Sequence, residues 1–409
     1  MSAQIDLPPA PATLELPPLR LKRGEDRRLR AGHLWVFSNE VDNDATPLTD
    51  LPMGAMVRVL SDRDLFLGYA YVNPHALICA RILSRSPVHL PDRSLLVHRL
   101  KVALALRERL YTAPYYRWAF GESDGLPGLV LDRYGDIVVG QIATAGMEAL
   151  RADIEAAVVA VLDPRVLVWK NDGGARELEQ LPRQLLTPVG RVPEELQVLE
   201  AGLNYTVPLA SAQKTGWFYD QCANREQWRR LIAPGARVLD VCSYAGAWAI
   251  SALSHGAASA LCVDASEAAL AVAARNAVAN GVTVQTRRGD AFDVLDELVR
   301  SGERFDAIVL DPPAFIKRKK DIPRGQAAYR KLNQAAMRLL ERDALLVSCS
   351  CSYHLAPDEL VGLIQSAART TGRFVQIIYS GGQSPDHPMH PAIPETRYLK
   401  AFFCRATRE

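Results

Sequence analysis

The chain contains 409 residues, of which 48% are hydrophobic and 23% are charged, and its formal net charge is +2. This composition is typical of a folded globular protein and excludes a fibrous or wholly disordered one, and the length favours two or three domains. A net charge so close to zero excludes binding to nucleic acid through a general positive field. Any such binding must rely on local basic patches.

The seven cysteines are scattered along the chain without the paired spacing of a zinc site. Their distribution predicts reduced thiols, no metal centre and a cytoplasmic location. Residues 1–17 contain neither Lys nor Arg, and no apolar run reaches the roughly 18 residues that a membrane helix needs. We therefore expect neither a signal peptide nor a membrane span.

Five prolines in the first 18 residues disfavour both helix and sheet hydrogen bonding, which predicts a disordered tail over residues 1–18. Six basic residues then fall between Arg20 and Arg30. Short β-type runs separated by turn residues follow over residues 32–37, 56–60, 65–72 and 76–83. These patterns predict a small all-β domain over residues 19–90.

Helical and strand-like patterns are mixed over residues 91–200, which predicts an α+β connecting domain. We expect a helix over 93–110, a hairpin over 128–139 that turns at Tyr-Gly-Asp, a helix over 147–162 and a strand over 165–170.

Strand and helix patterns alternate regularly over residues 201–409. Apolar strands are predicted over 237–241, 259–263, 283–287, 305–310 and 344–350, and a last strand over 398–404 is expected to pair antiparallel. This alternation predicts a Rossmann-like α/β domain whose sheet is covered by helices on both faces.

Acidic residues follow four of these strands in succession: Asp240, Asp264, Asp290 and Asp311. Ligands of open parallel sheets bind at the carboxyl ends of the strands, so these carboxylates predict a binding site there. Gly246 lies in the first strand-to-helix turn, where a glycine lets the backbone approach a ligand. The position of Asp264 suits ribose hydroxyls, although it could instead cap the helix predicted over 267–280.

The turn that begins at Asp240 carries Cys242 and Tyr244 where many nucleotide-binding loops have glycine. The sequence contains no Gly-x-Gly-x-x-Gly, which disfavours a nicotinamide dehydrogenase, and no Gly-x-x-x-x-Gly-Lys for a nucleoside triphosphate. A nucleoside cofactor without phosphates is therefore favoured, and we predict S-adenosylmethionine.

The fourth strand ends in Asp311-Pro312-Pro313-Ala314-Phe315. Two prolines make a stiff loop, since they can continue neither a central strand nor a helix interior. The Asp311 carboxylate and the proline carbonyls can accept hydrogen bonds from the amino group of a base, and Phe315 can stack on it. In the alternative interpretation, these prolines only terminate the strand.

The fifth strand ends in a segment with two cysteines, Cys349 and Cys351. Carbon 5 of cytosine becomes nucleophilic only after something adds to carbon 6, and a thiolate suits this addition. Cys351 is better placed than Cys349, which lies further inside the apolar run. Either residue could instead be a buried core cysteine.

The chain resembles the bacterial class I ribosomal RNA large-subunit (23S) cytosine 5-methyltransferases that carry an N-terminal PUA domain. The resemblance implies that residues 19–90 form a small RNA-binding β-barrel and that a mixed seven-stranded sheet builds the domain that binds the cofactor. The stretches that carry it are Gly32–Glu40, Gln213–Gln221, Asp311–Phe315 and Ser350–Ser352.

Site residues follow from this resemblance. It implies that Lys214, Thr215, Phe218 and Asp220 lie near the methionine end of the cofactor, together with the predicted contacts Asp240, Tyr244, Gly246, Asp264, Asp290 and Asp311. It also implies that Cys351 is the nucleophile and that Asp311 positions the base. Many members of such families have a second cysteine after the proline of the fourth-strand motif, where this chain has Ala314, so the group that removes the cytosine proton is not identified.

Ribosomal RNA is the expected partner, with Pro312, Pro313, Phe315, Lys317 and Arg318 as substrate contacts. The basic segments near residues 20–30 and 317–320 could bind phosphates or could simply be solvated faces. Two other functions remain open: methylation of an adenine or guanine amino group, and a non-catalytic RNA-binding role in ribosome assembly. The oligomeric state, including a homodimer, is open as well.

Overall fold

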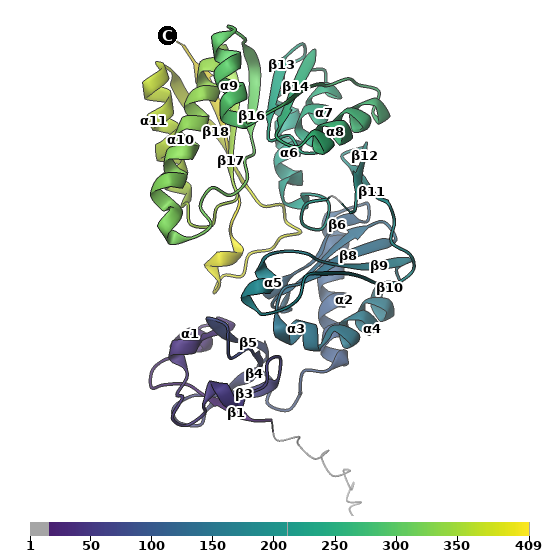
Figure 1. Ribbon diagram of the computed structural model, residues 1–409, viewed down its shortest axis with the longest axis vertical. Helices are drawn as coiled ribbons and strands as arrows, with labels where there is room; N and C mark the ends of the chain where they lie inside the picture. The colour runs from purple at the N-terminus through teal and green to yellow at the C-terminus, as the bar shows by residue number, and fades with distance from the viewer. Residues whose placement is uncertain (1–15, 211, 409) are drawn as a thin grey trace, which may run out of the picture.

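The computed structural model describes residues 16–210 and 212–408, which form three domains in chain order (Figure 1). The N-terminal domain is a five-stranded sheet of order β1-β3-β4-β5-β2 with a one-turn helix, α1 (Arg27–Arg30). Its strands are β1 (Pro18–Arg20), β2 (Trp35–Phe37), β3 (Met56–Leu60), β4 (Phe66–Val72) and β5 (Ile78–Ser84). The predicted all-β character of this part is confirmed.

The predicted tail is too long at its C-terminal end. Pro18 begins β1 and pairs in parallel with Arg58 of β3. A proline is tolerated there because it is the first residue of an edge strand, where no ladder hydrogen bond from its nitrogen is needed. The remainder of the tail, residues 1–15, lies outside the described residues.

The central domain is a second five-stranded sheet, of order β10-β9-β8-β7-β6. Its strands are β6 (Tyr115–Phe120), β7 (Leu129–Tyr134), β8 (Ile137–Ile142), β9 (Val166–Asn171) and β10 (Gln184–Val189). Its helices are α2 (Arg93–Leu110), α3 (Ala145–Ala149), α4 (Arg151–Leu162) and α5 (Ala175–Leu178). The α2 helix and the β7–β8 hairpin confirm the prediction, whereas the expected helix over 147–162 is two helices that divide at Leu150.

A hairpin links this domain to the last one and was not predicted. Its strands are β11 (Glu195–Glu200) and β12 (Leu203–Pro208), and alternate residues such as Leu196 and Tyr205 are buried. The predicted domain boundary between residues 200 and 201 therefore falls inside a single hairpin.

The C-terminal domain is a seven-stranded mixed sheet of order β15-β14-β13-β16-β17-β19-β18, which confirms the predicted fold class. The strands are β13 (Arg237–Val241), β14 (Ser259–Asp264), β15 (Gln285–Arg288), β16 (Phe305–Leu310), β17 (Leu340–Ser350), β18 (Phe374–Gly382) and β19 (Lys400–Thr407). The helices are α6 (Cys222–Leu231), α7 (Ala247–Leu253), α8 (Glu267–Ala279), α9 (Ala291–Arg300), α10 (Ile322–Leu339) and α11 (Pro357–Thr371). β19 runs antiparallel to both of its neighbours, β17 and β18, whereas the other neighbouring strands pair in parallel.

Helices cover both faces of this sheet (Figure 1). Along β16, Ala307 and Val309 belong to one hydrophobic core, whereas Ile308 and Leu310 belong to the core on the other face. A strand buried on both sides carries a continuous apolar run, as the sequence of β16 does. No helix in residues 16–210 or 212–408 is long and apolar enough to cross a membrane.

Candidate active site

A cavity of about 530 Å³ opens at the carboxyl ends of β13, β14 and β16, and residues of the segment 213–221 line it from another side. Most of the predicted site residues line this cavity, although they are far apart in the sequence. They are Lys214, Phe218, Asp220, Tyr244, Asp264, Asp290, Asp311, Pro312, Pro313, Phe315 and Cys351.

The turn between β13 and α7 has a strained backbone. Cys242 and Tyr244 adopt positive φ angles of 65° and 47°. Residues other than glycine rarely occupy this left-handed region. The Asp264 carboxylate supports this turn, because it accepts a hydrogen bond from the Tyr244 backbone nitrogen at 2.9 Å. Strain of this kind persists where neighbouring contacts determine the conformation, as they do at ligand sites.

Gly246 serves helix packing and does not line the cavity, unlike our prediction. It has a φ of 79° and precedes α7, and a Cβ atom there would lie 2.9 Å from the Cβ of Ala273 in α8. A glycine is needed because α7 and α8 pack closely at this point.

Asp264 is not the cap of α8. The cap is Ser266, whose hydroxyl accepts a hydrogen bond from the Ala269 nitrogen, while Asp264 accepts one from the Ser266 nitrogen at 2.9 Å. The alternative interpretation of Asp264 as a helix cap is therefore wrong. Each carboxylate oxygen retains a lone pair that can accept a further hydrogen bond in the cavity.

Asp290 does cap a helix, since its carboxylate accepts a hydrogen bond from the Phe292 nitrogen at 2.9 Å at the start of α9. Phe292 also lines the cavity, and its ring lies 6.1 Å from that of Phe315. An exposed carboxylate beside two aromatic rings can hold a planar ring that bears an amino group.

Asp240 is fully buried and does not line the cavity, so the expected direct contact is wrong in this structure. One of its carboxylate oxygens accepts a hydrogen bond from the Ala249 nitrogen at 3.1 Å. The other has no partner among the described residues. Burial raises the pKa of Asp240 to about 8, which favours a neutral carboxyl group beneath the turn.

Asp311 lies deep in the cavity, at the end of β16. It accepts hydrogen bonds from the Gln221 side chain at 2.9 Å and from the Trp248 indole at 3.2 Å. Burial raises its pKa to about 6. A carboxyl group of this kind can accept or share a proton near neutral pH.

Asp220 remains ionised although it is buried. Burial opposes its charge, but nearby Lys214 and His387 together with a hydrogen bond from Tyr398 lower its pKa to about 2. The Tyr398 hydroxyl donates to Asp220 Oδ2 at 2.6 Å, and Oδ1 has no partner among the described residues. A buried charged oxygen that lacks a partner is suited to a ligand with hydrogen-bond donors.

Thr215 is buried and does not line the cavity. Its hydroxyl donates a hydrogen bond to Asp132 of the central domain. The expected direct contact of Thr215 with the cofactor is therefore not supported, whereas its neighbour Lys214 does line the cavity.

The two cysteines at the end of β17 differ in environment. Cys349 is 1% exposed and belongs to a hydrophobic core, whereas Cys351 is half-buried and lines the cavity beside the carbonyl of Pro312. The interpretation of Cys351 as a core residue is therefore wrong. Burial raises the pKa of the Cys351 thiol, and nearby Lys214 opposes this rise.

The serines on either side of Cys351 fix its position. The hydroxyls of Ser350 and Ser352 each lie 2.9 Å from the Tyr329 hydroxyl, and Ser352 also accepts a hydrogen bond from the Ile316 nitrogen at 3.1 Å. This buried cluster connects the cysteine to the loop that follows Asp311.

Lys317 and Arg318 lie outside the cavity, in an exposed basic stretch over residues 317–320 that follows the Asp311 loop. They could reach a bound polynucleotide at the rim but not a base inside the cavity. No group of His, Cys, Asp and Glu side chains in the described parts of the chain could hold a metal ion.

Several residues of the site were not predicted from the sequence. Gln221 ends the segment Gln213–Gln221, but no pattern in that segment indicates its contact with Asp311. Trp248 and Phe292 have spacings typical of ordinary helix residues. Tyr398 lies at the end of a loop without regular secondary structure, and no sequence pattern predicts its contact with Asp220.

The chain is similar to known proteins over most of its length. Residues 19–85 match the family model described as PUA-like domain, and residues 220–380 match one described as Conserved hypothetical protein 95. Ribosomal RNA large subunit methyltransferase I of Erwinia tasmaniensis is 34% identical over 400 residues, which cover 95% of this chain and 98% of that protein. The protein of the same name from Alteromonas mediterranea is 32% identical with the same coverage.

The chain belongs to the ribosomal RNA large subunit methyltransferase I family. The two alignments cover 95% of this chain and 98% of each relative, so the membership includes all three domains. The resemblance inferred from the sequence motifs is confirmed at the level of this family.

Solved structures support the fold of this methyltransferase I family member. SMU.776, named as a candidate methyltransferase and solved with SAH, superposes with a TM-score of 0.82 at 22% identity and covers 95% of this chain and 100% of its own. A candidate SAM-dependent methyltransferase from Streptococcus mutans gives a TM-score of 0.80 with the same identity and coverage. The fold is thus a PUA-like domain followed, after the central domain, by a class I methyltransferase domain.

Proposed function

We propose that the protein transfers a methyl group from S-adenosylmethionine to carbon 5 of a cytosine in large-subunit (23S) ribosomal RNA, with Cys351 as the nucleophile. The observation that carries this proposal is that the Cys351 thiol and three of the four strand-end carboxylates, Asp264, Asp290 and Asp311, line the same cavity. The names of the relatives support the ribosomal RNA substrate.

The side chains around the cavity fit S-adenosylmethionine. Asp264 suits the ribose hydroxyls, the edge formed by Asp290 and Phe292 suits an adenine, and the unpartnered oxygen of Asp220 suits the amino group of the methionine end. Acidic side chains also favour a sulfonium cation. When bound, the cofactor supplies an electrophilic methyl group.

A second cysteine, Cys242, lines the cavity as well, but its surroundings disfavour a thiolate. Burial raises its pKa, and four carboxylates add to this effect: Asp264, Asp311, Asp240 and Asp290. Burial, Asp311 and Asp220 raise the pKa of Cys351 as well. Lys214 lies close enough to oppose this rise, whereas no cation among the described residues opposes it at Cys242. The electrostatics therefore favour Cys351 as the nucleophile.

The reaction would begin with addition of the Cys351 thiolate to carbon 6 of the cytosine, which makes carbon 5 nucleophilic. Carbon 5 would then take the methyl group while the cofactor sulfur keeps the electron pair of the broken bond as a thioether. A base would remove the carbon 5 proton, and elimination of the thiolate would restore the ring double bond. Asp311, with a pKa raised to about 6, would hold the base and share a proton with its ring nitrogen as charge develops.

The first prediction concerns this nucleophile. Cys351→Ala should lower the rate of methylation by at least about 100-fold, because the carbon 6 adduct cannot form. Mass spectrometry of digested ribosomal RNA measures the product as 5-methylcytidine, and titration calorimetry with S-adenosylmethionine shows whether the pocket still binds the cofactor. Cys349→Ala, two residues away in the core, is the matched control and should retain activity.

Three results would contradict this proposal in different ways. A Cys351→Ala variant that methylates at the wild-type rate would exclude the adduct. An N-methylated purine as product would favour the amino-group reaction. A wild-type protein that shows no heat with S-adenosylmethionine would favour the non-catalytic assembly role.

A further inference from the structure

The central domain supports the wall of the cavity from behind, through contacts of β7 with the segment 214–220. The Tyr134 hydroxyl donates to the Thr215 carbonyl at 3.3 Å and accepts a hydrogen bond from the Trp217 nitrogen at 2.9 Å. Asp132 lies two residues earlier in β7, on the same face of the strand, and accepts the hydrogen bond from the Thr215 hydroxyl. Two neighbouring side chains of β7 therefore fix Thr215.

Asp132 makes a second side-chain contact, with Arg117. It is completely buried, and the Arg117 guanidinium of β6 donates to its two oxygens at 2.8 and 2.9 Å. A bidentate pair of this kind fixes the orientation of the carboxylate as well as its charge. The third hydrogen bond of this carboxylate comes from the hydroxyl of Thr215, the residue that follows Lys214 of the cavity wall.

The contacts that fix Thr215 also affect its neighbour Lys214, which lines the cavity. Its φ is 52°, a left-handed conformation that costs free energy for a residue other than glycine. Its ammonium group lies 4.7 Å from the centroid of the Phe218 ring and 3.8 Å from Asp220 Oδ2. Because Thr215 follows directly in the chain, its fixed position determines where the Lys214 side chain points.

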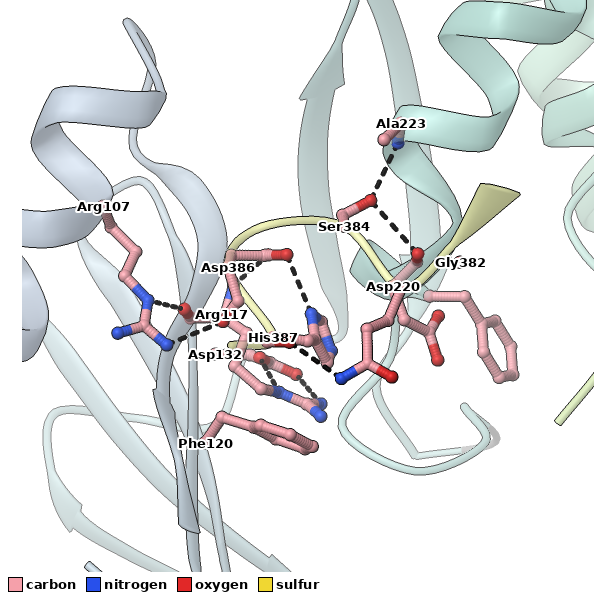
Figure 2. A network of polar contacts seen from close by, with 12 residues as sticks. Arg107, Arg117, Phe120, Asp132, Asp220, Ala223, Gly382, Ser384, Asp386 and His387 are labelled. Carbon is pink, nitrogen blue, oxygen red and sulfur yellow. Dashed lines mark hydrogen bonds and ion pairs between the residues drawn. The ribbon is translucent and has the colours of Figure 1, made fainter. Parts of the chain in front are cut away.

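A second group of contacts holds Asp220 from the opposite end of the segment. It comes from the strap, which we define as residues 383–399 between β18 and β19. The backbone nitrogen and the hydroxyl of Ser384 both donate to the Asp220 carbonyl, at 2.8 and 3.1 Å. Asp386, two residues later, accepts a hydrogen bond from the Arg117 nitrogen at 2.8 Å. Figure 2 shows that Arg117 lies between these two groups, with Asp132 on its side chain and Asp386 on its backbone.

We propose that Asp132 and Arg117 are positioning residues for the cofactor. In this arrangement Arg117 orients the Asp132 carboxylate, Asp132 orients Thr215, and Thr215 keeps Lys214 and Asp220 directed towards the cavity. The central domain is then part of the cofactor pocket and not a spacer between the RNA-binding and catalytic domains. The inference rests on the proposed function in that the ligand of the cavity is S-adenosylmethionine.

Thr215→Val is the best variant to test this inference. It removes only the hydrogen bond to Asp132, whereas Asp132→Asn would leave the Arg117 guanidinium without its anionic partner and would endanger folding. Thr215→Ser keeps the hydroxyl and should restore the wild-type behaviour. Thr206→Val makes the same chemical change in β12, where the hydroxyl contacts only the exposed side chain of Gln197.

We expect Thr215→Val to weaken the binding of S-adenosylmethionine about tenfold, as expected when one buried hydrogen bond is lost. The KM for the cofactor should rise by the same factor, while kcat at saturating cofactor and the KM for RNA stay within about threefold of wild type. Without any cofactor, the amides of residues 214–220 should exchange hydrogen faster than in the wild type or in Thr206→Val.

The outcomes separate this inference from the proposed function. Wild-type protein that does not bind S-adenosylmethionine would overturn both. Wild-type protein that binds it, together with a Thr215→Val variant of unchanged affinity, would overturn only the inference. Weaker binding by Thr215→Val with unchanged amide exchange in the free protein would also overturn it, because Thr215 would then act by touching the cofactor directly.

Discussion

Two carboxyl groups at neighbouring strand ends, one half-buried and one fully buried, have different relations to the cavity. Asp311 faces it, with a pKa raised to about 6, whereas Asp240 lies beneath the β13–α7 turn, with a pKa raised to about 8. Both rises are caused first by burial. Since the two residues follow the same pattern in the sequence, only their surroundings distinguish a ligand contact from a structural group.

Asp240→Asn should change how stability depends on pH. The pKa of Asp240 is higher in the folded than in the unfolded protein, so the folded state binds the proton more tightly. Its contribution to stability is therefore lost as the pH rises from about 4 to about 8, at roughly 1 kcal/mol per pH unit. Urea unfolding across this range should show a smaller decline for Asp240→Asn than for wild type.

Asp44→Asn is the control for this experiment, because it makes the same substitution at an exposed position of the N-terminal domain. It should follow the wild-type profile. Equal slopes for Asp240→Asn and wild type would show that Asp240 is ionised in the folded protein.

At the scale of elements, the end of β17 is joined to the loop after β16 through α10. The Tyr329 hydroxyl contacts Ser350 and Ser352, and Ser352 also holds the Ile316 nitrogen. This arrangement places the proposed nucleophile and the Asp311 loop at a fixed separation. Positioning of reacting groups contributes strongly to rates, and small displacements are costly.

Tyr329→Phe should therefore lower kcat by about tenfold and leave the affinity for S-adenosylmethionine unchanged, since the serine hydroxyls lose their common partner. Single-turnover methylation and titration calorimetry measure the two quantities. Tyr69→Phe in β4 removes one hydrogen bond, to the Pro87 carbonyl, and should leave kcat as in wild type. A Tyr329→Phe variant with an unchanged single-turnover rate would show that this cluster does not position Cys351.

At the scale of the whole molecule, the strap leaves the C-terminal sheet and reaches the other domains (Figure 1). Its Asp386 carbonyl accepts a hydrogen bond from Arg107 at 2.6 Å, and Arg107 also forms a bidentate pair with Asp124. A Cβ atom on Gly32 of the N-terminal domain would lie 3.5 Å from the Cβ of Ala392. One loop thus contacts the domain expected to bind RNA, the central domain and the wall of the cavity.

Arg107→Ala should lower the free energy of unfolding by about 3 kcal/mol, because it leaves the buried Asp124 carboxylate without its cation and removes a link between two domains. Urea unfolding measures the change. Arg165→Ala makes the same substitution at an exposed ion pair of the same domain and should have no measurable effect. Equal stability of the two variants would exclude a role for this pair in joining the domains.

The sequence alone determined the alternation of strands and helices in the C-terminal domain, because strands buried on both faces carry apolar runs that are visible without any partner. It also determined the acidic strand ends and favoured Cys351 over Cys349, since both depend on position along one strand. It did not show β18, in which Phe374, Ile377, Ile378 and Tyr379 are exposed in no regular alternation. Pairing with β19 makes that segment a strand.

Only the tertiary structure decided which of the predicted residues reach the cavity. Asp240, Gly246 and Thr215 satisfy the same local patterns as Asp264 and Lys214, but packing of α7 on α8 and the contact with Asp132 direct them elsewhere. The partners that determine this lie on other elements, in α7, α8 and β7. Local patterns are set by neighbouring residues, whereas burial and hydrogen-bond partners are set by segments that meet only after folding.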